Sequence, residues 1–331
     1  MKIVFSLLPV LLFLVSLFLL DSFKLVRIKT LILCLIWGMA SAASAYYVNT
    51  FLTDKLSLNF NHFSRYLAPL VEESLKILLI IYLISRQKIG FSIDAAIYGF
   101  AAGTGFALVE NLVFLNRLGT ESQMAIWILR GFGTALMHGG CSAIIAMLLI
   151  DGIQREKSLL FSIFQGLLVG YLLHSAFNHF FLNPYLQTVI IFTILPVVFI
   201  IVFQKSTNML QNWLEIEFSN EVEMLRMIKQ GKFSGTKAGA YLVSLKKHFD
   251  PEMIFDLYCY ISLYMELSIK AKRNMMLKEN GFQIIQEDDI IEKLNELKQL
   301  RKQIGKVGEL AMQPLIRMKH RELWKLNQLR N

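Results

Sequence analysis

The sequence has few cysteines, few prolines and few charged residues. It contains three cysteines and six prolines, and 18% of its 331 residues are charged. Cys34 and Cys141 lie in apolar runs and Cys259 lies in a charged region, a scatter that supplies neither a disulfide framework nor metal-ligand spacing. We expect all three thiols to pack as small apolar groups. The scarcity of proline, glycine and charge excludes collagen-like and disordered chains.

Apolar residues are abundant and the charges are unevenly placed. Hydrophobic residues make up 55% of the chain and the mean hydropathy is +0.49, which is too apolar for an ordinary soluble protein. Charged residues account for 23 of the first 205 positions but 36 of the last 126. We therefore predict a transmembrane, protease-like domain at residues 1–205 and a soluble helical tail at residues 206–331. The net charge of +9 is shared almost evenly between them, so neither carries the concentrated basic face of a nucleic-acid-binding protein.

Stretches of about 20 apolar residues predict seven transmembrane helices. They cover residues 3–20, 30–52, 66–85, 92–115, 126–150, 159–182 and 186–204. The first stretch is interpreted as a spanning helix instead of a signal peptide, because no small-x-small cleavage pattern precedes Asp21. The predicted fold class is an all-α polytopic membrane protein with about seven transmembrane helices and a C-terminal helical domain in the cytosol.

Basic residues in the loops predict the orientation of the chain. The loops after the first, third, fifth and seventh spans contain Lys24, Arg27, Lys29, Arg86, Lys88, Arg155, Lys157 and Lys205. The alternate loops contain only Lys55, Arg65 and Arg117. Because positively charged loops stay on the cytoplasmic side, the N-terminus is expected outside and the tail in the cytoplasm.

The tail has the pattern of soluble amphipathic helices. Asp250 followed by Pro251 is a helix start, and an apolar stripe that includes Leu257 and Ile261 follows at helical spacing. A second stripe over residues 289–304 stops at Gly305. These stripes favour either the core of a small helical bundle or a docking or dimerisation surface. The tail contains no catalytic motif that we can identify.

Polar residues inside the predicted spans indicate function, because ionisable groups in a bilayer are costly. The spans contain Glu72, Glu73, Lys76, Glu110, Asn111, His138, Ser142, His174 and Asn178. Glu72 and Lys76 are four residues apart, so the lysine is expected to pair with this carboxylate and to hold helices together. One lysine cannot neutralise Glu73 as well, and a carboxylate without a cation is suited to general acid–base chemistry.

The depth of these residues predicts that they meet. At 1.5 Å per residue, Glu72, Glu73, Glu110, His138 and His174 all lie about 9 to 12 Å below the outer membrane surface. We therefore expect one water-accessible cavity in the outer half of the bilayer. Three glycines on the fourth span would permit the close helix approach that such a cluster needs, although packing alone explains them equally well: Gly99, Gly103 and Gly105.

Four motifs, each on its own predicted span, carry a resemblance to a known family. They read Glu72-Glu73-x-x-Lys76, Phe106-x-x-x-Glu110-Asn111, His138-x-x-x-Ser142 and His174-x-x-x-Asn178. With these motifs, residues 62–182 resemble the PrsW family of intramembrane proteases, within the CAAX-protease and bacteriocin-immunity superfamily. The resemblance implies an endopeptidase of a bacterial cell membrane that cuts a membrane-anchored protein near its extracytoplasmic side. An anti-sigma factor, cut in site-1-type signalling, is the substrate that the family implies.

The resemblance also implies roles for the residues. Glu72 or Glu73 would activate water, while His174 and Asn178 would stabilise the oxyanion. His138 and Glu110 would complete the site, and the supporting residues would be Lys76, Asn111 and Ser142.

The residues leave the metal requirement open. His138, His174 and Glu110 could form a zinc set with an open position for water. The same residues could also work without metal, since the sequence has no zinc-protease helix of the His-Glu-x-x-His type.

Two other classes of protein remain as alternatives. A non-catalytic membrane adapter or immunity-type protein would use the polar residues for hydrogen bonds between helices. A proton-coupled carrier could use intramembrane glutamate and histidine, but we find no internal repeat of broken helices. The substrate's identity and the oligomeric state are not determined by the sequence.

Overall fold

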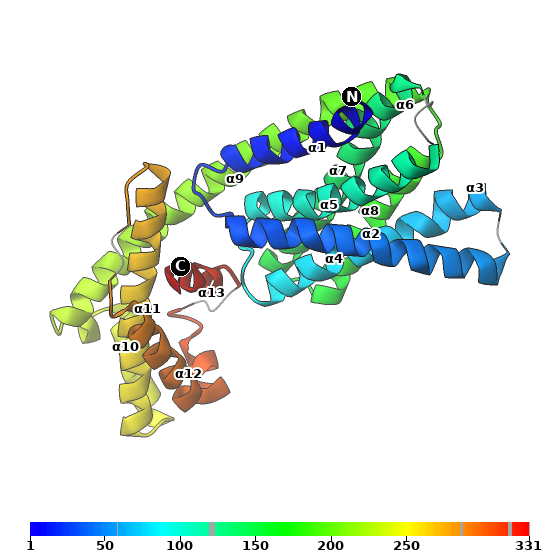
Figure 1. The fold of residues 1–331 in the computed structure, drawn as a ribbon. Coiled ribbons are helices and arrows are strands. Elements are labelled where there is room, and N and C mark those ends of the chain that lie inside the picture. Colours follow the sequence, from blue (N-terminus) through cyan, green and yellow to red (C-terminus); the bar gives the residue numbers. More distant parts are fainter. Residues whose placement is uncertain (58, 119–122, 285–286, 317–319, 331) are drawn as a thin grey trace. The chain divides into compact units, whose positions relative to one another are not determined.

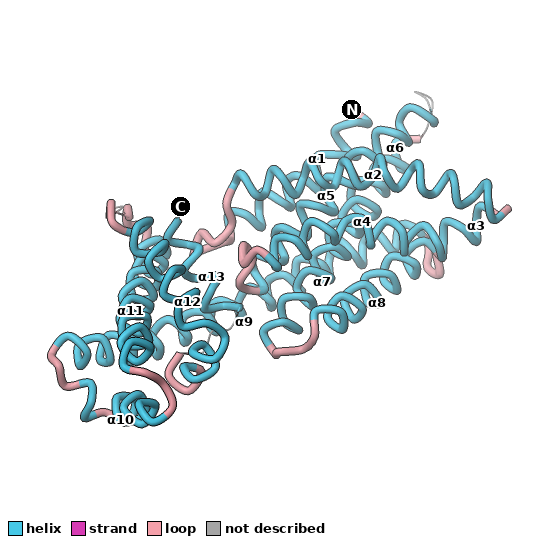
Figure 2. Tube along the Cα trace, turned by 90° about the horizontal axis from the view of Figure 1, so that it is seen from below, coloured by secondary structure: helices cyan, strands magenta, loops and turns pink. Residues whose placement is uncertain are grey.

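The computed structural model describes residues 1–57, 59–118, 123–284, 287–316 and 320–330 of the chain. The structure is 86% helical, and its described residues contain no strand (Figure 2). These residues form two compact units, Met1–Ser206 and Thr207–Asn331, hereafter the membrane unit and the tail unit. The predicted all-α fold class is confirmed.

The membrane unit is built from long helices joined by short connections (Figure 1). Its helices are α1 (Lys2–Leu19), α2 (Ile28–Leu56), α3 (Phe60–His62), α4 (Ala68–Ser85), α5 (Ser92–Leu118), α6 (Met124–Leu129), α7 (Ala135–Gln154), α8 (Leu159–Asn178) and the first part of α9 (Pro184–Lys229). Two π-helical turns, Phe63–Leu67 and Arg130–Thr134, join α3 to α4 and α6 to α7. Each pair therefore runs as one helix with a more widely wound turn inside it.

Six helices of the described residues are long and apolar enough to cross a membrane. They cover Lys2–Leu19, Ile28–Leu56, Ser92–Arg117, Met124–Gln154, Leu159–Asn178 and Pro184–Lys229. The third predicted span corresponds to α4, which has 18 residues but is made more polar by Glu72, Glu73 and Lys76. The last predicted span was expected to end at residue 204, whereas α9 continues as one helix to Lys229. The reason is that no glycine or proline follows Lys205 until Gly231.

Helices α5 and α7 lie in the interior of the membrane unit. Within the apolar 18-residue stretch of each helix, 89% of the residues are buried in α5, against 22% in α1. The corresponding share is 78% for Met124–Gln154, the segment that contains α7. Helix α5 packs against both α2 and α7 (Figure 1). A Cβ atom at Gly103 would lie 2.2 Å from the carbonyl oxygen of His138, and one at Gly105 would lie 2.0 Å from that of Leu35. The expected close approach at these glycines is confirmed, and it brings α5 against the helix that carries His138.

In its described residues, the tail unit contains the rest of α9 and four shorter α-helices. These are α10 (Lys237–Ser244), α11 (Pro251–Glu279), α12 (Ile290–Met312) and α13 (His320–Asn327). The carboxylate of Asp250 accepts a hydrogen bond from the backbone N–H of Met253 at 2.7 Å, which confirms the predicted helix start. Gly305 interrupts α12 with a φ of 60°, as the sequence predicted. Leu257 and Ile261 are fully buried, so their stripe forms part of the core.

Candidate functional site

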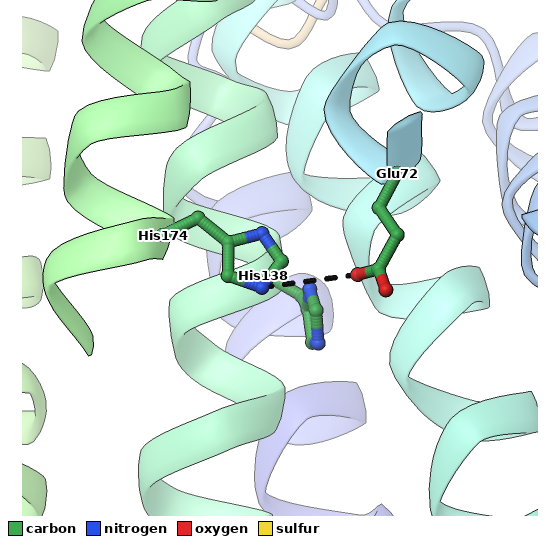
Figure 3. A group of neighbouring side chains, drawn as sticks. All are labelled: Glu72, His138 and His174. Atoms are coloured by element: carbon green, nitrogen blue, oxygen red, sulfur yellow. Dashed lines mark ion pairs between the residues drawn. The ribbon is translucent and has the colours of Figure 1, made fainter. Parts of the chain in front are cut away.

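Four helices bring six of the predicted site residues together in the membrane unit. The residues are Glu72, Glu73 and Lys76 from α4, Glu110 from α5, His138 from α7 and His174 from α8. The two imidazole rings lie 4.8 Å apart between centroids, with their planes at 89°. Figure 3 shows the side chain of Glu72 pointing toward both histidines from a separate helix. The expected convergence is therefore present in the structure.

Glu73 holds the ring of His174 in one orientation. An oxygen of Glu73, Oε1, lies 2.7 Å from Nδ1 of His174, and both side chains are buried. Because an ionised carboxylate only accepts hydrogen bonds, Nδ1 donates to Glu73, and in the neutral ring Nε2 is the nitrogen with the lone pair. Nε2 of His174 in turn lies 3.8 Å from Oε2 of Glu72. The nitrogen that can bind a ligand or accept a proton thus faces Glu72.

Lys76 holds the second histidine in a corresponding way. Its Nζ lies 2.6 Å from Glu73 Oε1 and 3.2 Å from Nδ1 of His138, and 4.7 Å from the ring centroid of Phe106. An ammonium group only donates, so Nδ1 of His138 accepts and its Nε2 carries the proton. The expected pairing of Lys76 with Glu72 is wrong. The neighbouring helices turn Lys76 toward Glu73, which is three residues away and fully buried.

Glu110 completes the contacts of His138, and it is itself held by an arginine. Oε2 of Glu110 lies 3.0 Å from Nε2 of His138 and 3.1 Å from Nη2 of Arg130. Nε of Arg130 donates to the side-chain oxygen of Asn111 at 2.8 Å. Arg130 was not predicted as a site residue. Its position inside the predicted apolar span of residues 126–150 was the available signal.

Asn49 on α2 is a second residue that the sequence did not reveal. Its Nδ2 donates to Oε1 of Glu72 at 3.4 Å. Asn49 lies in the second predicted span, where it belongs to none of the four motifs. Only the packing of α2 against α4 brings it to the site.

Asn178 and Ser142, two further predicted residues, share no hydrogen bond with this cluster among the described residues. Nδ2 of Asn178 donates to the carbonyl oxygen of Ser64 at 3.0 Å, and Ser175 donates to that of Arg65 at 2.6 Å. Both bonds attach α8 to the π-helical turn that leads into α4. The hydroxyl of Ser142 is buried and has no hydrogen-bond partner among the described residues. The roles predicted for both residues stay predictions.

The donor set at the centre of the cluster fits a zinc ion. Glu72, His138 and His174 each offer one ligand atom, and these atoms lie within 4.8 Å of one another. Two imidazoles and one carboxylate are the ligands of a common catalytic zinc site, with the fourth position left for water. Glu73 and Glu110 bind the other nitrogen of each ring, as carboxylate partners of zinc-binding histidines do. Metal binding at Nδ1 of His138 would displace the ammonium group of Lys76.

The carboxylate of this group differs from the predicted one. We expected Glu110 beside the two histidines, whereas the structure places Glu72 there and Glu110 on the far nitrogen of His138. The side chains of Glu72 and Glu110 remain 15% and 29% exposed, while the lysine and both histidines are at most 2% exposed. The two carboxylates are therefore the more exposed members of an otherwise buried cluster.

The sequence matches one known family. The model of the PrsW family intramembrane metalloprotease matches residues 27–204. The matched segment contains every residue of the cluster, whereas α1 and the tail unit lie outside it. No curated protein and no solved structure matches the chain.

Proposed function

We propose, from the premise that this chain belongs to the PrsW family of intramembrane metalloproteases, that it hydrolyses a peptide bond in a membrane-anchored protein. The observation that carries the proposal is the pair of buried imidazoles beside Glu72. Each ring has one nitrogen bonded to a carboxylate: Nδ1 of His174 contacts Glu73, and Nε2 of His138 contacts Glu110. The other nitrogen of His174, Nε2, faces Glu72. Such preorganisation is typical of hydrolytic sites that activate water.

Glu72 is the residue that we assign to the chemical step. It is partly exposed and only weakly bonded, by Asn49 at 3.4 Å, whereas Glu73 is fully buried between Lys76 and His174. Glu72 can therefore bind a metal or accept the proton of water, while Glu73 orients His174. A zinc ion bound by Glu72 and the two histidines would polarise the scissile carbonyl and make water more acidic.

Lys76 and Glu110 have supporting roles in this proposal. The ammonium group of Lys76 lies beside His138 in a buried site, where its charge can stabilise negative charge that develops on the scissile carbonyl. Glu110 holds the Nε2 proton of His138 and so keeps Nδ1 directed into the cluster.

The substrate that fits this site is a single-span membrane protein cut near its extracytoplasmic end. The loop charges support an outside N-terminus and a cytoplasmic tail, and with this orientation our proposal has the site in the outer half of the bilayer. By resemblance to the family, an anti-sigma factor of a bacterial cell membrane is the substrate class we propose. A cytoplasmic reporter fused to the C-terminus of the full chain should be active, and an active periplasmic reporter there would overturn this orientation.

Co-expression tests the protease assignment. The full chain is produced with candidate single-span proteins tagged at both ends, and the products are compared with those of Glu72→Gln. We expect a cleavage product with the wild type and none with Glu72→Gln, at equal amounts of membrane-inserted enzyme. Glu223→Gln, an exposed change in the tail unit, is the matched control and should cleave normally. Cleavage at the wild-type rate by both Glu72→Gln and Glu73→Gln would contradict the assignment, and co-purification of an uncleaved protein would favour an adapter.

A further inference from the structure

A chain of hydrogen bonds and one ion pair connects the first helix to the histidine pair. Nδ2 of Asn111 donates to the carbonyl oxygen of Ser6 on α1 at 2.8 Å. Arg130 donates to the other end of the same carboxamide at 2.8 Å and pairs with Glu110 at 3.1 Å. Glu110 then accepts from Nε2 of His138 at 3.0 Å. We call these residues, Ser6, Asn111, Arg130, Glu110 and His138, the α1 relay.

The backbone of α1 lies directly against the turn that carries Arg130. A Cβ atom at Gly131 would lie 1.9 Å from the carbonyl oxygen of Phe5, so only glycine permits this approach. Pro9 is four residues beyond Phe5 and has no N–H, so it cannot donate the helical hydrogen bond that the Phe5 carbonyl would otherwise accept. Two independent features therefore hold α1 near Arg130: the Gly131 approach places it against the π-helical turn, and the Asn111 bond attaches it to the α5 residue that Arg130 contacts.

The relay restricts the one site carboxylate that is most exposed. Glu110 is 29% exposed and could turn away from His138 if nothing held it. Arg130 prevents this because its guanidinium is bonded to Asn111 and stacked over the ring of Phe114 at 3.7 Å. Fixing Glu110 fixes the proton on Nε2 of His138, and hence the nitrogen that faces the cluster.

We propose that Arg130 is a positioning residue of this site and that α1 anchors it. The inference rests on the proposed proteolytic function and extends it to a helix outside the segment that the family model matches. Arg130 acts through Glu110 on His138 and touches no reacting atom. Its loss should lower turnover and metal affinity while substrate binding stays the same.

Arginine variants in the purified full chain test the first half of the proposal. Arg130→Gln is expected to lower kcat by about 10- to 100-fold, the range for carboxylate partners of metal-binding histidines. KM for the single-span protein that the wild type cleaves should change less than about twofold, because the relay does not touch the substrate. Arg130→Lys should recover part of the loss, since it keeps the charge toward Glu110. Arg117→Gln, which removes an exposed arginine stacked over Tyr46, is the control and should behave as the wild type.

Zinc affinity provides a readout that does not depend on turnover. Competition with a chromogenic chelator should give Arg130→Gln an affinity about 10- to 100-fold weaker than that of the wild type. The control Arg117→Gln should keep the wild-type affinity. If Arg130→Gln does not accumulate in the membrane, Arg130→Lys and the glycine variants below are measured in its place.

Glycine variants test the role of α1. Gly131→Ala places a methyl group against the Phe5 backbone and should lower both kcat and zinc affinity. Gly133→Ala lies in the same turn but faces the side chain of Thr188, so it is the matched control. Wild-type kcat and zinc affinity in Arg130→Gln, or equal effects of the two glycine variants, would overturn the inference. If the wild type itself cleaves nothing, the proposed function fails instead, and the zinc measurements alone decide the relay.

Discussion

Both units of the molecule bury lysines against carboxylates, yet only one of them has the features of a reactive site. In the membrane unit Lys76 is 1% exposed, and in the tail unit Lys272 and Lys325 are fully buried. Each unit also holds three side chains close enough to share a metal ion. They are Glu72, His138 and His174 in the membrane unit, and Glu217, Glu221 and Glu322 in the tail unit.

The cluster in the tail unit is balanced by its own cations. Nζ of Lys272 lies 3.0 Å from both Glu217 and Glu221, and Lys325 pairs with Glu221 at 3.2 Å and with Glu322. The guanidinium of Arg321 supplies a third positive charge beside Glu217 and Glu322. Three carboxylates thus meet three cations.

Tyr264 adds a hydroxyl to the tail cluster. It donates to Glu322 at 2.7 Å. Burial, together with the negative charge of Glu322, raises the pKa of Tyr264 well above its ordinary value, so the hydroxyl stays a donor. Lys272, Lys325 and Tyr264 all donate hydrogen bonds to carboxylates of this cluster, which is typical of a structural network.

The cluster in the membrane unit is not balanced in this way. Its three carboxylates, Glu72, Glu73 and Glu110, face two cations, Lys76 and Arg130, and two imidazoles. Each imidazole also has one nitrogen that contacts neither Glu73 nor Glu110: Nε2 of His174 lies 3.8 Å from Glu72, and Nδ1 of His138 lies 3.2 Å from Lys76. The comparison teaches that a buried ion pair is weak evidence of chemistry, whereas a surplus carboxylate beside oriented histidines is strong evidence.

Metal removal should separate the two clusters most strongly. Treatment of the full chain with a strong chelator is expected to abolish cleavage, and zinc should restore it, because the imidazoles of the membrane unit fit zinc. The tail unit should keep its stability throughout, since lysines fill its acidic cluster. Cleavage of the single-span substrate and hydrogen exchange of α11 measure the two effects. Undiminished cleavage after complete zinc removal, verified by metal analysis, would favour the metal-free alternative.

Lys272→Met should have the next largest effect, confined to the tail unit. Removing one partner of a buried ion pair leaves carboxylates uncompensated, so we expect a loss of about 3 to 5 kcal/mol in the free energy of unfolding of the tail. Hydrogen exchange of α11 in the full chain measures this loss. Lys298→Met, which removes an exposed lysine of α12, is the control. Proteolysis per inserted molecule should stay at the wild-type level, and its loss would mean that the tail contributes to the site.

Glu73→Gln should have a smaller effect on the membrane unit than loss of Glu72. The amide oxygen of glutamine carries no negative charge, so it accepts a weaker hydrogen bond from Nδ1 of His174. The imidazole ring is then oriented less firmly, and cleavage should fall about 10- to 100-fold. Glu221→Gln makes the corresponding change in the tail cluster and should leave the cleavage rate unchanged. Initial rates on the same single-span substrate measure both. Complete inactivity of Glu73→Gln, equal to that of Glu72→Gln, would mean that Glu73 takes part in the chemical step.

The smallest effect is expected at the partly exposed ion pairs of the tail. Partial burial alone would raise the pKa of Glu266, but hydrogen bonds from Lys293 and Lys270 outweigh it and lower this pKa. A lowered folded-state pKa adds stability above the unfolded-state pKa, and this stability is lost as pH falls through the folded value. Glu266→Gln should cost at most about 1 kcal/mol at neutral pH and nothing in acid. Urea unfolding of α11, monitored by hydrogen exchange at several pH values, measures this cost. An equal loss of unfolding free energy at all pH values would contradict the prediction.

Much of the site could be predicted because its residues recur at helical spacing within otherwise apolar segments. Glu72, Glu110, His138 and His174 are visible for this reason, and alternating helices carry them to a similar depth. Arg130 and Asn49 could not be found in the same way. They belong to no repeated pattern, and they reach the site only through the packing of α5 against α7 and of α2 against α4.

The exact pairing of charges was also beyond the sequence. Spacing on one helix allows Lys76 to reach either Glu72 or Glu73, and the difference between these contacts is small in an isolated helix. In the folded chain Lys76 lies against Phe106 and His138, which leaves Glu73 as its partner. The end of α9 was missed for a related reason, because the sequence marks where the apolar run ends and not where the helix does.

The sequence by itself determined the all-α membrane class, the motif residues and the start of α11 at Asp250. These follow from local physics, because hydropathy, helical spacing and capping depend on neighbours within a few residues. The tertiary structure decided which nitrogen of each histidine faces the cluster, which carboxylate lies beside both rings, and that α1 packs against the turn of Arg130. Those features depend on contacts between residues as distant as Ser6 and Asn111, or Glu73 and His174. Only the packing of whole helices places such residues within hydrogen-bond distance.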